Sequence, residues 1–100
     1  MARPRSQLQA ILKGITSNVY FQPPNGTMLK YPCIIYERDT IDVLHADNQK
    51  YRNTKRYAVT VIDRNPDSSL PDAVLELPLC AHNRFFTSDD LNHDVFTLYF

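Results

Sequence analysis

The chain is poor in glycine, with only Gly14 and Gly26 among its 100 residues. Glycine-rich phosphate-binding loops need several glycines within a few positions, so a nucleotide-binding loop of that kind is excluded. The HExxH zinc motif and the GxSxG nucleophile turn are also absent from the sequence. No segment approaches the ~18 consecutive apolar residues of a membrane-spanning helix. We therefore expect a protein that is not an enzyme and has no membrane partner.

Cysteine is scarce as well, since the chain contains only Cys33 and Cys80. Cytoplasmic thiols are normally reduced, and a small buried cysteine is common in protein cores. The basic residues at positions 1–5 lead into no signal-like apolar stretch. These features predict a protein that is made and used in a cytoplasm.

The formal net charge is zero, but the charges are unevenly distributed along the chain. Residues 1–60 contain nine Lys and Arg against four Asp and Glu, whereas residues 61–100 contain two against seven. If the two halves surface on different sides, the domain has oppositely charged faces, which favour ordered docking of copies or partners. If the fold interleaves the halves, the asymmetry disappears. The sequence leaves both alternatives open.

Apolar periodicity predicts two helices. The first begins with Ser6 as its cap, and its inward residues recur at helical spacing: Leu8, Ile11, Leu12 and Ile15. The second follows "NPDSSLP", with Ser68 or Ser69 as cap and Pro71 in the first turn. Each helix has one apolar stripe, which must lie on a sheet to be buried.

Six segments are predicted as strands from their Tyr, Val, Thr, Ile and Phe content: residues 19–21, 31–38, 39–44, 55–64, 83–89 and 95–100. Residues 45–53 are predicted to be a connection, and residues 89–94 a turn or loop. Consecutive strands with short links favour an antiparallel sheet. The predicted fold class is α+β: one domain over residues 1–100, with a mostly antiparallel sheet of four to six strands and two helices packed on one face. The other face must be solvated or covered by a partner.

Candidate metal ligands are few. Cys80, His82 and His93, with Cys33 elsewhere in the chain, do not have the spacing of a zinc finger. A core cysteine beside loop histidines that form local hydrogen bonds explains them better. We expect no catalytic residue, no cofactor and no metal.

An acidic segment contains Asp89, Asp90 and Asp94. Paired carboxylates can act as a general acid and base. Aspartate is also a common turn former, so we interpret the segment as a solvated turn.

A basic cluster consists of Lys50, Arg52, Lys55 and Arg56, with tyrosines interleaved. Such a cluster can contact nucleic-acid phosphates while a tyrosine stacks on a base. A solvated hairpin or a subunit-contact loop explains it equally well. We treat these four residues as a hypothetical basic loop at a lumen or an interface.

A stiff loop is predicted at residues 22–29, between two strand-like runs. Pro23 and Pro24 have no N–H group and cannot extend a sheet there, and Asn25 with Gly26 turns the chain. A pre-ordered loop loses little entropy on docking. We hypothesise that Pro23, Pro24, Asn25, Gly26 and Thr27 form a partner-docking loop; a plain connector is the alternative.

The sequence resembles a family over about residues 6–100. The segments that carry the resemblance are "VYFQPPNGTMLKYPCIIYERD", "ADNQKY", "RYAVTVIDRNPDS" and "LPLCAHNRFFTSDDLNHDVFTLYF". They are similar to the small tail-terminator or tail-completion (head–tail joining, neck) proteins of long-tailed bacteriophages. The shared motifs are structural rather than catalytic, so no individual binding residue transfers from the family.

The resemblance implies a mixed sheet-and-helix fold that assembles into a ring, usually a hexamer. The ring caps the tail-tube protein, stops tube polymerisation and docks to the head–tail connector protein, and DNA passes through its lumen. The expected location is the virion tail or neck, with the host cytoplasm during assembly. A head-completion or stopper protein on the portal side is the alternative, and a small nucleic-acid-binding module is a third.

Overall fold

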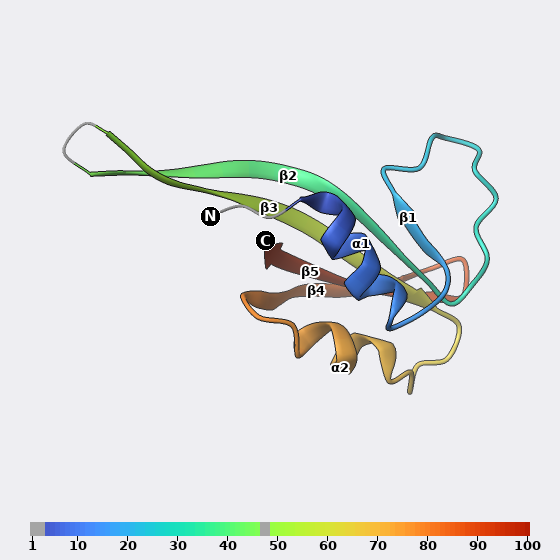
Figure 1. Cartoon of the computed structure of the whole chain (residues 1–100). Helices are drawn as coiled ribbons and strands as arrows, with labels where there is room; N and C mark the ends of the chain where they lie inside the picture. Colours follow the sequence, from blue (N-terminus) through green and yellow to red (C-terminus); the bar gives the residue numbers. More distant parts are fainter. Residues whose placement is uncertain (1–3, 47–48) are drawn as a thin grey trace.

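The structure is a computed structural model that describes residues 4–46 and 49–100, with the side chains of residues 40–54 outside the description. Its elements in chain order are α1 (Arg5–Lys13), β1 (Val19–Phe21), β2 (Cys33–Ala46), β3 (Gln49–Asp63), α2 (Leu70–Leu75), β4 (Cys80–Ser88) and β5 (Leu91–Tyr99). The strands form one sheet in the order β1-β2-β3-β5-β4, and every pair is antiparallel except β1 with β2 (Figure 1). The predicted α+β class, with a mostly antiparallel sheet, is confirmed.

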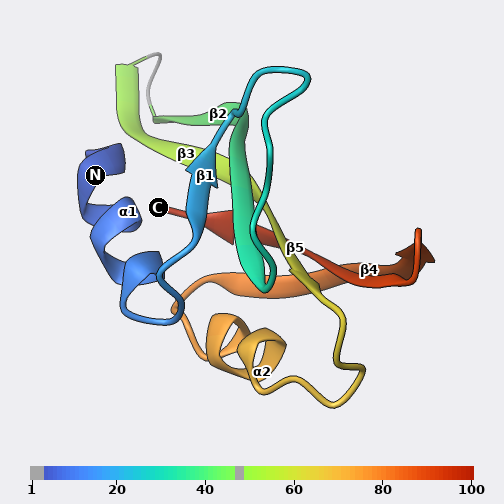
Figure 2. The same ribbon diagram turned by 90° about the vertical axis from the view of Figure 1, so that its right-hand side faces the viewer.

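The core lies between the two helices and one face of the sheet, as predicted (Figure 2). Leu8 and Leu12 of α1 and Val74 of α2 are fully buried. They belong to one cluster with alternate strand residues, which include Ile34, Tyr36, Tyr57, Val59, Val61, Phe96, Leu98 and Phe100. The alternation follows from the two-residue period of a strand, which points every second side chain to the same face.

Helix α1 starts two residues earlier than predicted. Ser6 is not its cap: the helix follows Pro4, whose extended backbone forms the N-cap, and no side chain caps the helix. Gln7 instead donates its N–H to the Pro4 carbonyl at 3.1 Å. The predicted end at Gly14 is confirmed, because the Gly14 N–H donates back to the carbonyls of the last turn. None of the described helices is both long enough and apolar enough to cross a membrane.

Strands β2 and β3 are longer than the sequence predicts. The segments 31–38 and 39–44 merge into β2, and most of the predicted connection 45–53 is strand rather than loop. Strand β5 pairs with β3 only as far as Arg56, whereas β2 and β3 continue to pair with each other up to Ala46 and Gln49. We call this two-stranded ribbon, residues 40–46 and 49–54, the arm; the molecule measures 51 × 25 × 23 Å along its principal axes (Figure 1).

The β4–β5 hairpin also differs from the expectation. Residues 89–94 were expected to form a turn or loop, but only Asp89 and Asp90 connect the strands, because β5 begins at Leu91. Both aspartates have positive φ, 53° and 62°. Two-residue hairpin turns of this kind need positive φ at both positions and usually use Asn-Gly or Asp-Gly. Asp-Asp lacks the glycine signal, so the sequence did not reveal the tight turn.

The orientation of α1 can be tested with two neighbouring variants. Leu12→Ala should lower the free energy of unfolding by about 3 kcal/mol, because it removes a fully buried side chain. Ile11→Ala is the matched control and should cost at most about 1 kcal/mol, since Ile11 is 37% exposed. Urea denaturation measures both values, and equal losses would contradict the way α1 packs on the sheet.

Candidate functional site

The predicted docking loop connects two parallel strands, not the two antiparallel strands of a hairpin. Residues 22–32 run from the end of β1 back to the start of β2. The two strands pair in parallel, beginning with Val19 of β1 and Ile34 of β2. Positive φ values at Gln22 (45°) and Gly26 (85°) turn the chain. Thr27 closes the tip, because its N–H and its hydroxyl both donate to the Pro24 carbonyl.

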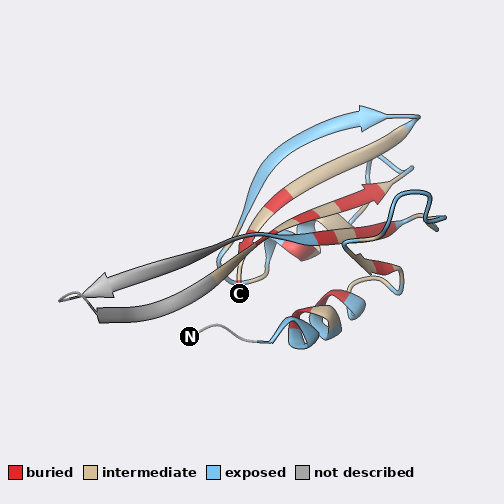
Figure 3. Cartoon of the chain, turned by 90° about the horizontal axis from the view of Figure 1, so that it is seen from above, coloured by how far each residue is buried: buried red, intermediate tan, exposed pale blue. Residues whose placement is uncertain are grey.

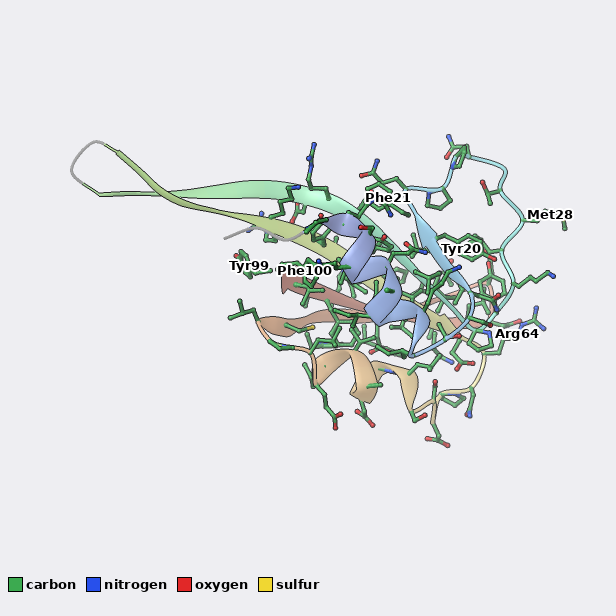
Figure 4. All side chains as sticks on the ribbon, viewed as in Figure 1. Tyr20, Phe21, Met28, Arg64, Tyr99 and Phe100 are labelled. Atoms are coloured by element: carbon green, nitrogen blue, oxygen red, sulfur yellow. The ribbon has the colours of Figure 1, made fainter. Side chains whose placement is uncertain are left out.

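The tip of this loop is exposed. Pro24, Asn25, Gly26 and Thr27 are exposed, and Pro23 is half-buried. The sequence analysis overlooked the next residue, Met28, whose side chain is 91% exposed and points away from the body (Figure 4). A single apolar residue in a polar loop has no periodic pattern that could have revealed it. The docking role of this loop stays a prediction.

The four residues of the predicted basic loop lie on a strand. Lys50 and Arg52 belong to β3, paired with His45 and Leu44, and their side chains are outside the described part. Successive strand residues point to opposite faces, so Lys55 and Arg56 diverge. Arg56 donates its Nε–H to Asp39 Oδ2 at 3.0 Å, whereas Lys55 shares the face of Tyr57. The structure therefore divides the predicted cluster.

Lys55 is brought together with two cations that are distant in the sequence. Arg5, Arg38 and Lys55 line an open hollow of about 330 Å³ together with Phe21, Gln22 and Tyr57. We call this the basic hollow; it lies where the arm leaves the body. Among the described side chains, no carboxylate lines it. The sequence analysis missed Arg5 and Arg38, because only the pairing of β2 with β3 and the packing of α1 bring them beside Lys55.

On the side of the hollow next to α1, the buried Tyr36 orients Arg5. Arg5 Nη1 donates to the hydroxyl of Tyr36 at 2.9 Å, and this hydroxyl donates to Gln9 Oε1. Arg5 lies on the first turn of α1, and its guanidinium lies 4.5 Å from the centre of the Phe21 ring of β1. Arg5 is thus oriented by neutral groups, and within the described side chains it forms no ion pair.

The floor of the hollow includes Tyr57, whose hydroxyl stays protonated. Burial raises the pKa of Tyr57, and neighbouring Tyr36 raises it further, whereas Arg38 and Arg5 act to lower it. A neutral hydroxyl can donate a hydrogen bond to an anion in the hollow. The hollow therefore offers positive charge and a hydrogen-bond donor, which suits the binding of an anion.

Two sheet edges and one sheet face are further candidate surfaces. The edges are the short β1 and the nine-residue β4, which is exposed along almost its whole length (Figure 3). Edge strands pair readily with another chain. The face away from the helices carries half-buried Ile35, Thr60 and Val95 near its centre, while Cys33 and Ile62 are buried at one end of it. A partner could pair with β4 or cover this face.

The histidines considered as metal ligands diverge. His82 pairs across the sheet with Phe96 on the helix-covered face, and its Nε2 lies 3.1 Å from Asp94 Oδ1. His93 lies on the opposite face, where its ring stacks on Phe86 with 4.6 Å between the centroids. Within the described residues, no three potential ligands come together. The carboxylate of Asp94 contacts His82. Asp94 is therefore separate from the Asp89–Asp90 turn, with which the sequence analysis had grouped it.

Comparisons of the sequence with protein-family models and with curated proteins give no match. The candidate surfaces therefore depend on the sequence pattern and on the geometry described above.

Thiol reactivity tests the placement of the two cysteines. Burial raises the pKa of Cys33 to about 11 and also raises the pKa of Cys80. Because the thiolate is the reactive form, maleimide should label half-buried Cys80 well before fully buried Cys33 in the folded protein. Mass spectrometry of Cys33→Ser and Cys80→Ser variants separates the two rates. Labelling of Cys33 as fast in the folded as in the unfolded chain would contradict its burial.

The same shift predicts a pH dependence of stability. Folding favours the protonated thiol of Cys33, so its contribution is fully present below the ordinary pKa of 9.0 and is lost as the pH rises toward 11. The measurement is urea unfolding of the native chain and of Cys33→Ala across this range. The difference in unfolding free energy between the two should shrink with rising pH, and a constant difference would contradict the shift.

Proposed function

We propose that this chain is a structural protein of a bacteriophage virion that forms a ring at the head-proximal end of a long tail. In this role it ends polymerisation of the tail tube and docks to the capsid connector. The sequence resemblance to tail-terminator and tail-completion proteins is the starting point. The α+β fold, with two helices on one face of a mixed sheet, agrees with the architecture that this resemblance implies.

The arm is the observation that carries the proposal furthest. Residues 40–46 and 49–54 continue the β2–β3 ladder beyond the last contact with β5, so no third strand pairs with this ribbon in the described part of the chain. A two-stranded ribbon alone is at best marginally stable in water. Packing against another chain would stabilise it, which is the arrangement expected of a subunit that assembly completes.

The positions of the other surfaces fit a subunit with different neighbours at its two ends. The arm projects from one end of the long axis, and the β1–β2 connection at residues 22–32, which contains the predicted docking loop, projects from the other end (Figure 1). A ring requires a heterologous contact, in which one face of a subunit meets a different face of the next. The exposed edge strand β4 can take part in such a contact through its free backbone groups.

Removing the gene for this chain from its phage should give tails of abnormal, extended length. The physical reason is that a tube without its terminating ring keeps an open end to which further tube subunits add. Electron microscopy of the lysate measures tail length, and a plasmid copy of the gene is the control. Normal free tails beside heads that lose DNA would instead indicate a stopper on the portal side and would overturn the terminator proposal.

Deleting Pro23–Thr27 should leave folding intact but abolish tail capping. The hydrogen bonds of Thr27 stay within the loop, and residues 24–27 are exposed, so the core loses nothing. Pro66→Ala with Asp67→Ala, in another exposed loop, is the control and should cap normally. Thermal unfolding verifies the fold, and complementation of the deleted gene measures capping. Tails of normal length and infectivity from the loop deletion would contradict the docking role.

The basic hollow supports a second candidate, a small nucleic-acid-binding module. Three uncompensated cations beside aromatic rings can bind a phosphate backbone. Binding of this kind weakens steeply as salt concentration rises, because counterions are released. A steep salt dependence of DNA affinity at micromolar protein concentration would favour this candidate over the assembly role.

A further inference from the structure

The basic hollow holds more positive charge than its surroundings balance. Arg5, Arg38 and Lys55 all line it, and the structure describes no ion pair for any of them. Helix α1 begins at Arg5 with no acidic residue in its first turn, so the partial positive charge of the helix end adds to the same region. Cations that share a hollow repel one another, and a bound anion would relieve that repulsion.

The Asp89–Asp90 turn has the complementary excess of negative charge. Both residues are exposed at the tip of the β4–β5 hairpin, and positive φ at each holds the turn in a tight two-residue form. Neither carboxylate forms an ion pair with any side chain that the structure describes. A narrow, projecting turn with two carboxylates has the shape and the charge to enter an open basic hollow.

The two features lie at opposite ends of the sheet, so one chain cannot join them. Strand β5 runs from the turn, where Leu91 pairs with Ser88, to the base of the arm, where Tyr99 pairs with Arg56. At about 3.3 Å per residue, the strand keeps the two ends roughly 25 Å apart. Figure 1 shows the β4–β5 hairpin and the arm extending toward opposite ends of the molecule.

We propose that the basic hollow of one copy receives the Asp89–Asp90 turn of a second copy of this chain. Guanidinium and carboxylate groups form strong charge-assisted hydrogen bonds, and Arg5 and Arg38 both supply guanidinium donors. Such a contact is heterologous, so each copy retains a free turn and a free hollow for further copies. The inference rests on the proposed ring, for which it names the subunit contact.

A charge-reversal pair tests this contact in purified full-length chain. Arg38→Glu with Lys55→Glu reverses the hollow, and Asp89→Lys with Asp90→Lys reverses the turn. Sedimentation velocity at low ionic strength should show wild-type chain associating with rising concentration, and less so at high salt. Each reversed variant alone should associate roughly 100-fold more weakly. An equimolar mixture of the two should recover association, because opposite charges again face each other at every contact.

The matched control for the turn variant is Asp67→Lys with Asp72→Lys, which adds the same positive charge at two other exposed acidic residues. It should associate like wild type, and thermal unfolding should show that all variants are folded. Wild-type chain that stays monomeric at millimolar concentration would overturn the inference. So would an equal loss in the control, or a mixture that fails to recover association. Loss of DNA binding without any change in self-association would identify the hollow as a phosphate site and overturn it too.

Failure of this contact and failure of the proposed function are distinguishable. If the charge-reversal mixture fails to associate while particles lacking the chain have overlong tails, the contact is wrong and the function stands. If the mixture associates while those particles have normal tails, the contact stands and the function is wrong.

Discussion

The register between β2, β3 and β5 is the constraint on which the rest of the structure depends. Burial of alternate residues against α1 and α2 sets this register, because a slip of one residue would turn Tyr36, Val59 and Phe96 away from the helices. The same ladder of paired strands also sets the positions of the arm, of the basic hollow and of the acidic turn. It continues into the arm, places Arg38 and Lys55 on one face beside Arg5, and sets the Asp89–Asp90 turn at the far end of β5.

The fold places the unevenly distributed charges of the sequence at separate ends of the sheet. The two halves of the chain do not interleave in the sheet: β1, β2 and β3 lie side by side, followed by β5 and β4 from the second half. Cations gather at the base of the arm, and the acidic hairpin turn lies at the opposite end. A sheet with opposite charges at its two ends favours one direction of association between copies.

Much of the fold was predictable from periodicity. The inward residues Leu8 and Leu12, and Phe96 and Leu98 in the last strand, follow the helical and strand repeats because each repeat faces the core. The arm was not predictable in the same way. Residues 45–53 have no apolar alternation of the kind that marks a strand, and their pairing between β2 and β3 is seen only in the structure. The sequence pattern therefore suggested a connection at residues 45–53, although it predicted a strand at residues 39–44.

The candidate site was predictable only in part. Lys55 was recognised as one of four clustered cations, but strand geometry separates it from Arg56, and tertiary packing gives it Arg5 and Arg38 as neighbours. The most direct test of the central claim is a cryo-electron microscopy reconstruction of the capsid–tail junction in the mature particle. The account predicts a closed circle of copies there, each with its acidic hairpin beside the basic hollow of its neighbour. A junction without density for this polypeptide would contradict it.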